Sequence, residues 1–345
     1  MTYSGTDPGG NQTTSDVFIL VGFSSLGKLQ MLLFLVLLVI YLVTVLGNMF
    51  IILVIKFSPS LHTPMYFFLL NLSVLDFCYT NSVVPQLLVH LLVEEKTISV
   101  TGCAVQMVVI TSTGVIDFCL LVAMAYDRYA AICHPLHYTT IMSNQLCARL
   151  AGALWFSVVS VKVAEVSWIF SLPFCVSNRI DNFLCDLPPV LKMACTNTSI
   201  EKILMLSKSL VFLISTFFLI ILSYVRIIYT LLKLPSVEGR RKAFSTCSSH
   251  LILVSFFYGT VFFTYLVPKS SSTWESVLNM ACTNTSIEKI LLLSKSLVFL
   301  ISTFFLIILS YVRIIYTILK MPSVEGRRKA FSTCSSHLIL GPDVF

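Results

Sequence analysis

The sequence predicts an all-α fold: a polytopic membrane protein, built as a bundle of seven transmembrane helices with an extracellular amino terminus. Apolar residues make up 57% of the 345 residues and charged residues only 11%, and the mean hydropathy is +0.90. So few charges cannot cover a water-soluble globule of this size, whereas a bilayer requires no charged coat. Seven apolar runs are long enough to cross a bilayer, and basic residues collect in alternate loops between them.

A membrane-spanning helix needs ~20 mostly apolar residues, because the hydrocarbon core is ~30 Å thick and a helix rises ~1.5 Å per residue. The runs that meet this length are, in order, 31–55, 65–93, 103–125, 150–174, 203–225, 243–267 and 290–312. Barrel strands alternate apolar and polar residues, and these runs do not. We therefore expect every span to be a helix.

Few charged residues lie inside the runs. The second and third runs hold Asp76 and Asp117, and the fifth holds Lys208. Lys162 and Glu165 lie three residues apart on one face of the fourth run, where they are expected to neutralise each other. An intramembrane carboxylate is costly, so a functional role is the first hypothesis for the two aspartates.

Lys and Arg define the orientation. They are concentrated after the first, third, fifth and seventh runs, and the remaining loops balance their charges, so the first set of loops is predicted to be cytoplasmic. The net charge of +7 is thus a topology signal, and no nucleic-acid partner is expected. No apolar run with a cleavage pattern precedes the first span, which is expected to act as the targeting signal. Asn11 begins a glycosylation sequon on the outer side.

A near-identical internal repeat is present. Residues 193–253 recur as 280–340, and the copies differ only at Met205/Leu292, Leu231/Ile318 and Leu234/Met321. Repeats that build solenoids or transporter halves diverge in sequence while they retain their shape. Near-identity therefore indicates a recent tandem duplication or a gene-model error, and both explanations stay open.

The repeat sets the expected organisation of the chain, because its second copy supplies the seventh span. The second copy of the sixth span stops at Leu340 and is too short to cross. The expected parts are an extracellular segment 1–28, a core of helices one to six at 29–267, an extracellular loop 268–289, a seventh span 290–319 copied from 203–232, and a cytoplasmic tail 320–345.

Five sequence strings indicate a family. They are Gly47-Asn48, Leu61-His62-Thr63-Pro64-Met65-Tyr66-Phe67-Phe68-Leu69, Met124-Ala125-Tyr126-Asp127-Arg128-Tyr129-Ala130-Ala131-Ile132-Cys133-His134-Pro135-Leu136, Ser223-Tyr224, and Lys242-Ala243-Phe244-Ser245-Thr246-Cys247-Ser248-Ser249-His250-Leu251. With them the chain resembles the olfactory (odorant) receptors of the rhodopsin-like G-protein-coupled class, from about residue 18 to about 267. The Asn-Pro-x-x-Tyr-type motif of that family's seventh helix is absent.

The resemblance implies a plasma-membrane receptor and no enzyme or cofactor. A small, mainly apolar odorant would bind within the helix bundle, and the receptor would activate a stimulatory olfactory-type heterotrimeric G protein; membrane lipid is the remaining partner. Asp127, Arg128, Tyr129 and Tyr224 would carry activation, because a restrained guanidinium offers its donors to the G protein and to Tyr224 when released. Without the seventh-helix motif, we expect seven inserted spans but weak coupling.

The resemblance also assigns the buried acids and the outer cysteines. Asp76 and Asp117 would share a sodium ion or protons with Asn48 in the inactive packing, or else serve as hydrogen-bonded structural acids. No other metal site is expected. The implied disulfides are Cys103–Cys185 and Cys175–Cys195, and Cys282, the duplicate of Cys195, could compete for the second pair.

Helical spacing groups the candidate ligand contacts on three faces. They are Met107, Ile110, Thr111, Gly114 and Val115 on the third span, Lys208 and Phe212 (with Val211 and Ser215) on the fifth, and Tyr258, Val261, Phe262 and Tyr265 on the sixth. Together they describe an apolar, aromatic cavity. Each face alone is also what ordinary helix packing produces. Lys208 either extends toward the outer interface or meets an acidic or carbonyl odorant.

Two other functions compete with this one. A transporter with an ionisable relay through the second, third and fourth spans would need broken helices or inverted halves, and the repeat here is direct. A non-signalling pseudogene or mis-assembled product, retained in the endoplasmic reticulum, is the second, because the seventh-helix motif is missing.

Overall fold

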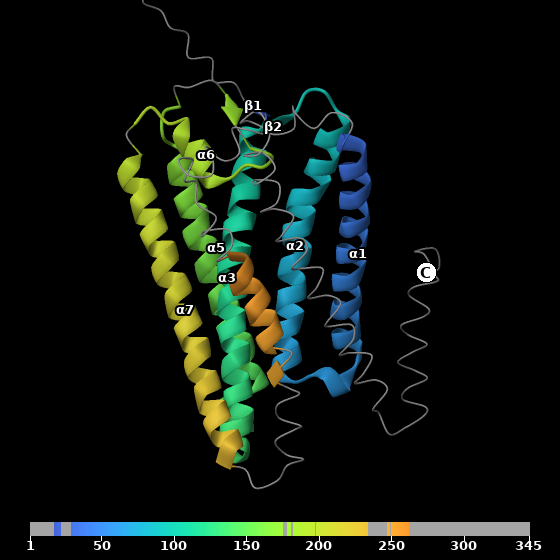
Figure 1. The fold of residues 1–345 in the computed structure, drawn as a ribbon, viewed down its shortest axis with the longest axis vertical. Helices are drawn as coiled ribbons and strands as arrows, with labels where there is room; N and C mark the ends of the chain where they lie inside the picture. The colour runs from blue at the N-terminus through green and yellow to red at the C-terminus, as the bar shows by residue number, and fades with distance from the viewer. Residues whose placement is uncertain are drawn as a thin grey trace, which may run out of the picture.

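The computed structural model describes residues 17–21, 29–174, 178–180, 182–196, 198–233, 247–248 and 250–261. Within these ranges the chain is a bundle of long α-helices (Figure 1). The long helices are α1 (Leu29–Phe57), α2 (Pro64–Leu92), α3 (Val100–Cys133), α5 (Asn144–Phe170) and α7 (Ser199–Lys233). The connections contain α4 (Tyr138–Ile141), α6 (Leu187–Lys192) and the 3-10 turns η1 (Pro59–Leu61) and η2 (Pro135–His137). A shorter apolar helix, His250–Val261, is called the sixth segment below.

Five helices among the described residues are long and apolar enough to cross a membrane. They coincide with the first five predicted spans, so the helical prediction is confirmed for that part of the chain. The sixth segment lies inside the sixth predicted span. The seventh span (290–319), the loop 268–289 and the tail 320–345 lie outside the described residues, as does Asn11.

Local sequence sets where the helices begin. Pro64 occupies the first turn of α2, where its missing N–H is not needed by the helix. Ser99 caps α3 by accepting a hydrogen bond from the Gly102 N–H at 3.0 Å. Ser143 caps α5 in the same way through the Leu146 N–H at 3.3 Å. The caps satisfy N–H groups that have no partner inside the helix.

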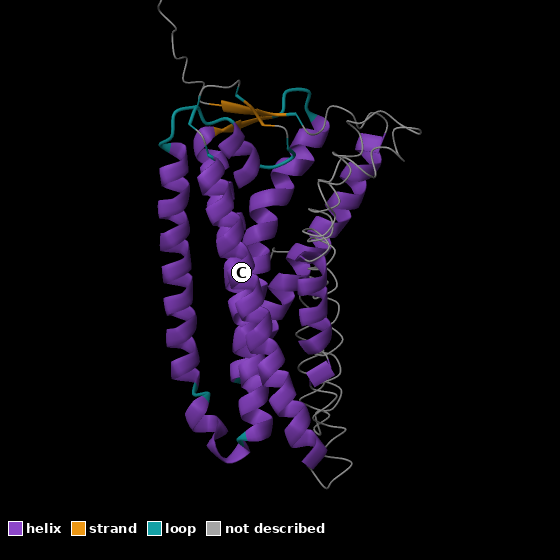
Figure 2. Cartoon of the chain, turned by 60° about the vertical axis from the view of Figure 1, so that its left-hand side comes forward, coloured by secondary structure: helices purple, strands orange, loops and turns teal. Residues whose placement is uncertain are grey.

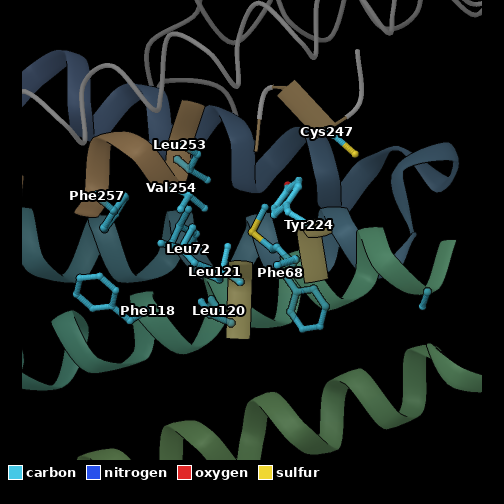
Figure 3. Close-up of a cluster of buried hydrophobic side chains, with 14 of the residues drawn as sticks. Phe68, Leu72, Phe118, Leu120, Leu121, Tyr224, Cys247, Leu253, Val254 and Phe257 are labelled. Carbon is cyan, nitrogen blue, oxygen red and sulfur yellow. The ribbon is translucent and has the colours of Figure 1, made fainter. Parts of the chain in front are cut away.

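Helix α3 is the centre of the bundle. It packs on α2, α5 and α7, whereas α1 packs mainly on α2. The largest apolar cluster joins α2, α3, α7 and the sixth segment (Figure 3), with Phe68, Leu72, Phe118, Leu120, Leu121, Tyr224, Leu253, Val254 and Phe257 among its members. Trp155 on α5 donates its indole N–H to Asn71 on α2 at 3.1 Å. These contacts fix the depth of α3 relative to its neighbours.

A small sheet covers the outer end of the bundle (Figure 2). Strand β1 (Val17–Leu20) pairs antiparallel with β2 (Thr97–Ser99) and parallel with β3 (Arg179–Ile180), in the order β2-β1-β3. The sequence interpretation had no strands, so this sheet is an addition to the predicted all-α fold. Phe18 of β1 is buried and its ring packs against Phe170 and Phe174, with centroids 6.4 and 6.2 Å away.

A disulfide between Cys103 and Cys185 ties α3 to the outer loop, the pairing that the family resemblance implied; the Cα atoms are 5.3 Å apart and both residues are buried. Gln106 lies one turn further along α3 and accepts a hydrogen bond from the Cys185 N–H at 3.0 Å. Cys195 is also disulfide-bonded, while Cys175, its implied partner, lies outside the described residues. The outer loop is therefore held on α3 by a covalent bond and a buried amide.

Candidate functional site

The cytoplasmic end of α3 carries the first part of the site. Asp127 has no exposed surface, and its two carboxylate oxygens bind different partners. Oδ2 accepts from the Arg128 guanidinium at 2.5 Å, and Oδ1 accepts from the Tyr138 hydroxyl at 2.7 Å. Tyr129, the third residue of the predicted set, contacts His134 through its hydroxyl at 3.1 Å instead of joining this group. Arg128 is thus restrained by a carboxylate that is itself held by the neighbouring loop.

Tyr138 was not singled out from the sequence. It begins α4, just beyond the membrane-spanning part of α3. Burial raises the pKa of the Tyr138 phenol, and the hydrogen bond and negative charge of Asp127 raise that pKa further. The phenol therefore stays protonated at neutral pH and remains a hydrogen-bond donor to Asp127. Only its 11-residue separation from Asp127, across a loop, obscured this partnership in the sequence.

The second part joins α7 to the sixth segment. The Tyr224 hydroxyl is 2.7 Å from His250 Nδ1, and the two rings are stacked. The Tyr258 hydroxyl donates to Thr216 Oγ1 at 2.8 Å. Both pairs fit one antiparallel register, since the partners are spaced by eight residues on each helix. Tyr224 was predicted as a partner for Arg128, and in this structure its hydroxyl is engaged with His250.

The third part is the pair of intramembrane acids. Asp76, Asp117 and Asn48 are 4%, 1% and 1% exposed, and the two carboxyl groups lie close enough to interact electrostatically. Asn48 donates to the Thr44 carbonyl of its own helix at 3.1 Å. Within the described residues, Asp117 Oδ1 and Thr80 Oγ1 are buried without a hydrogen-bond partner, and no group of three or more His, Cys, Asp or Glu residues is arranged to hold a metal.

The predicted ligand contacts on α3 differ in their surroundings. Met107 is 1% exposed and packs in the outer cluster, and Ile110 packs against the cluster of α1 and α2. Thr111 donates to the Met107 carbonyl of its own helix at 2.8 Å, and Val115 is partly buried. A Cβ atom placed on Gly114 would meet nothing within 4 Å. Open space therefore adjoins α3 at Gly114.

An aromatic group lies one turn below Gly114. Phe118 on α3 packs edge-on against Phe212 of α7 and Tyr258 of the sixth segment, with ring centroids 6.2 and 5.1 Å apart. Val261 packs against the same cluster. Phe212 and Tyr258 were predicted. Phe118 was missed, although it lies four residues after Gly114 on the same helical face, because the predicted face ended at Val115. The remaining two candidates, Phe262 and Tyr265, lie outside the described residues.

Lys208 lies apart from this aromatic group. It is exposed and lines an open hollow on α7 with Ser207, Val211, Phe212 and Ser215. The sequence grouped Lys208, Val211, Phe212 and Ser215 on one helix face, and the hollow contains all four. Phe212 is the residue that belongs to both the hollow and the aromatic group.

A bundle of membrane-length helices around a central helix with a buried acid-arginine pair at one end is the architecture of rhodopsin-like G-protein-coupled receptors. The model of the olfactory receptor family matches residues 37–273 and, a second time, residues 266–341. Olfactory receptor 10A4 from Homo sapiens is 47% identical over 282 residues, which cover 81% of this chain and 90% of the relative. Olfactory receptor 10C1 from the same species is 50% identical over 254 residues, 74% of this chain and 81% of the relative.

A dog relative extends the comparison beyond one species. Olfactory receptor-like protein OLF3 from Canis lupus familiaris is 47% identical over 262 residues, 76% of this chain and 83% of the relative. The chain belongs to the olfactory receptor family. It is a multi-pass plasma-membrane odorant receptor of the G-protein-coupled class and not an enzyme. The second family match falls on the copied segment, so that segment is itself recognisable as receptor sequence.

We expect Tyr138→Phe to raise ligand-independent signalling, because it removes one of the two hydrogen bonds that hold buried Asp127 beside Arg128. Loss of a hydrogen bond to a charged group shifts the resting equilibrium by on the order of tenfold. Basal cyclic AMP per receptor at the cell surface is the measurement. Tyr126→Phe, on the same helix end but exposed, is the matched control. Unchanged basal signalling in Tyr138→Phe would remove this residue from the restraint.

Proposed function

We propose that this receptor binds a small, mainly apolar odorant beside Gly114 and Phe118, and that binding loosens the contacts that hold α7 on the sixth segment. The observation that carries the proposal is the pair of hydrogen bonds Tyr258–Thr216 and Tyr224–His250 in one register. One pair lies at the aromatic group and the other lies two turns nearer the cytoplasm. A shift of Tyr258 is therefore transmitted along a single rigid helix.

The effect of ligand binding at the cytoplasmic end follows from the hydrogen-bond partners of Tyr224 and Arg128. When Tyr224 leaves His250, its hydroxyl becomes available to the Arg128 guanidinium, and Asp127 loses its hold on that arginine. The released guanidinium has five N–H donors, which suits recognition of backbone carbonyls and carboxylates on a G protein. We assign the roles of Asp127, Arg128 and Tyr224 on this basis, with a stimulatory olfactory-type heterotrimeric G protein as the partner; for Tyr129 the assignment rests on the family resemblance alone.

The acids Asp76 and Asp117 are assigned to the inactive state. Two buried carboxyl groups that interact electrostatically cannot both stay ionised without a counter-charge, so they hold a proton or a small cation such as sodium. The fit is supported by the unpartnered oxygens of Asp117 and Thr80, since oxygen ligands suit such a cation. Asn48 completes the group on α1. A bound sodium ion would supply the positive charge that lets both carboxylates remain ionised.

We propose weak coupling for the chain as written, because the core 29–267 is followed by a copied fifth helix. The copy at 290–319 contains neither a proline nor an Asn-Pro pair. Asp76 therefore lacks the partner that the seventh helix of this family supplies. The same observation favours the second candidate function, a non-signalling product retained in the endoplasmic reticulum. Surface delivery separates the two, because only a weakly coupling receptor reaches the plasma membrane.

Arg128→Ala tests the coupling assignment. We expect odorant-evoked cyclic AMP to be lost at equal surface expression, since Ala removes every donor that the guanidinium offers. Arg149→Ala removes a basic residue near the cytoplasmic end of α5 and is expected to leave the response within twofold, as is usual for an exposed charge. Full signalling by Arg128→Ala would contradict the assignment.

Gly114→Val tests the ligand position. The added side chain fills the space beside α3, so odorant potency is expected to fall by ~10-fold or more while surface expression is kept. Gly152→Val is the matched control, because Gly152 also has open space beside it but lies on the exposed side of α5. Dose-response curves give both potencies. Equal potency in the two variants would place the ligand elsewhere.

A further inference from the structure

The hollow on α7 has a defined position on the helix. Its lining residues, Ser207, Lys208, Val211, Phe212 and Ser215, follow one face over two turns. Phe217 lies on the opposite side of the helix, since successive residues turn by about 100°. The Phe217 ring contacts Tyr258 of the sixth segment, with centroids 5.0 Å apart. The hollow therefore opens on the side of α7 away from the sixth segment.

Helix α3 forms the inner boundary of this region. Phe212 reaches α3 through its contact with Phe118. Helix α5 packs on α3 as well but scarcely on α7, so α5 does not cover the face of α7 that carries the hollow. Val211 is 68% exposed, as expected for a side chain at this surface.

The charge in the hollow comes from Lys208. Ser207 and Ser215 donate their hydroxyl protons to the Leu204 and Phe212 carbonyls of α7, both at 2.9 Å. Lys162 on α5 is paired with Glu165 at 2.7 Å, whereas Lys208 forms no salt bridge with any residue that the structure describes. A basic side chain within a span is unfavourable without a partner, so an anionic partner is favoured there.

The outer end of the bundle is a poor entrance for such a partner. The three-stranded sheet lies across it, with Phe18 and Leu20 of β1 only 4% and 1% exposed. The outer loop is held on α3 by the disulfide at Cys103 and by Gln106. An apolar molecule dissolved in the bilayer, by contrast, reaches the hollow without crossing any described element.

We propose that this hollow binds a lipophilic carboxylate, a small acid with an alkyl or aryl tail, that enters from the bilayer. Lys208 pairs with the carboxylate, and the tail lies on Val211 and Phe212. The hollow is a second site, separate from the one proposed beside Gly114 and Phe118, and it rests on the proposed function only for the effect of binding on signalling. Phe212 links binding in the hollow to signalling, because it contacts Phe118 in the aromatic group between α3, α7 and the sixth segment.

The test uses the full chain in nanodiscs of phosphatidylcholine and a ten-carbon fatty acid that carries a photoreactive diazirine. Lys208→Met is expected to reduce photolabelling by on the order of tenfold, and Lys208→Arg is expected to retain it, because it retains the charge. The sequence offers an internal control: Lys295 occupies the same position in the copied helix. Lys295→Met is expected to keep full labelling. Undiminished labelling of Lys208→Met, or loss in Lys295→Met alone, would overturn the proposal.

Three further experiments identify the chemical group that Lys208 binds and the path by which the ligand enters the hollow. The methyl ester of the probe is expected to label weakly and without dependence on Lys208; equal labelling by ester and acid would exclude the ion pair. Phosphatidic acid in the nanodisc is expected not to displace the probe, and displacement would assign the hollow to lipid phosphate instead.

Val211→Trp is expected to slow labelling relative to Leu210→Trp, which lies at the same depth outside the hollow; equal rates would exclude entry from the bilayer.

These measurements read binding without a G protein. Loss of cyclic AMP signalling with Lys208-dependent labelling intact would count against the proposed coupling and leave the binding site standing. If photolabelling does not depend on Lys208 while the receptor still signals, the result would count against the binding site alone.

Discussion

The bilayer offers no hydrogen-bond partner to a polar side chain, so each polar group inside the bundle has to find one within the protein. Helix α3 carries two of the buried residues that meet this constraint, Gln106 and Asp127. Gln106 serves α2 and the outer loop, donating to Gln86 at 2.8 Å and accepting from the Cys185 N–H. Asp127 serves the cytoplasmic loop through Tyr138. These hydrogen bonds hold α2 and two loops on α3, and the aromatic group of Phe118 lies between Gln106 and Asp127 along the helix.

In the proposed mechanism, this arrangement would carry the effect of ligand binding along one helix to the G-protein end. Phe118 and Asp127 are carried by the same continuous α-helix, and the facing pair, α7 and the sixth segment, is held by two hydrogen bonds at matching depths. A packed core changes between discrete arrangements and does not deform gradually. Displacement at the aromatic group therefore reaches Tyr224 and His250 as a change of partner.

Much of this follows from local sequence properties. The first five spans were predictable because insertion depends on apolar length and flanking basic residues, both of which are local. Burial of Asp76 and Asp117 followed from their position within spans. Partners distant in the chain were not predictable in this way: β1 is four residues long and its neighbours are loops from elsewhere. Tyr138 and His250 were missed for the same reason, since only the packed helices bring them to Asp127 and Tyr224.

The central proposal is that α3 and α7 carry the residues needed for G-protein coupling, and that the copied segment 290–319 limits signalling. The most direct measurement replaces 290–345 with the seventh helix and tail of an ordinary olfactory receptor, which restores an Asn-Pro partner for Asp76. Odorant-evoked cyclic AMP is then compared with that of the parent at equal surface density. The account predicts a clearly stronger response in the chimera. An equal response would show that the copied helix is competent and would contradict the claim.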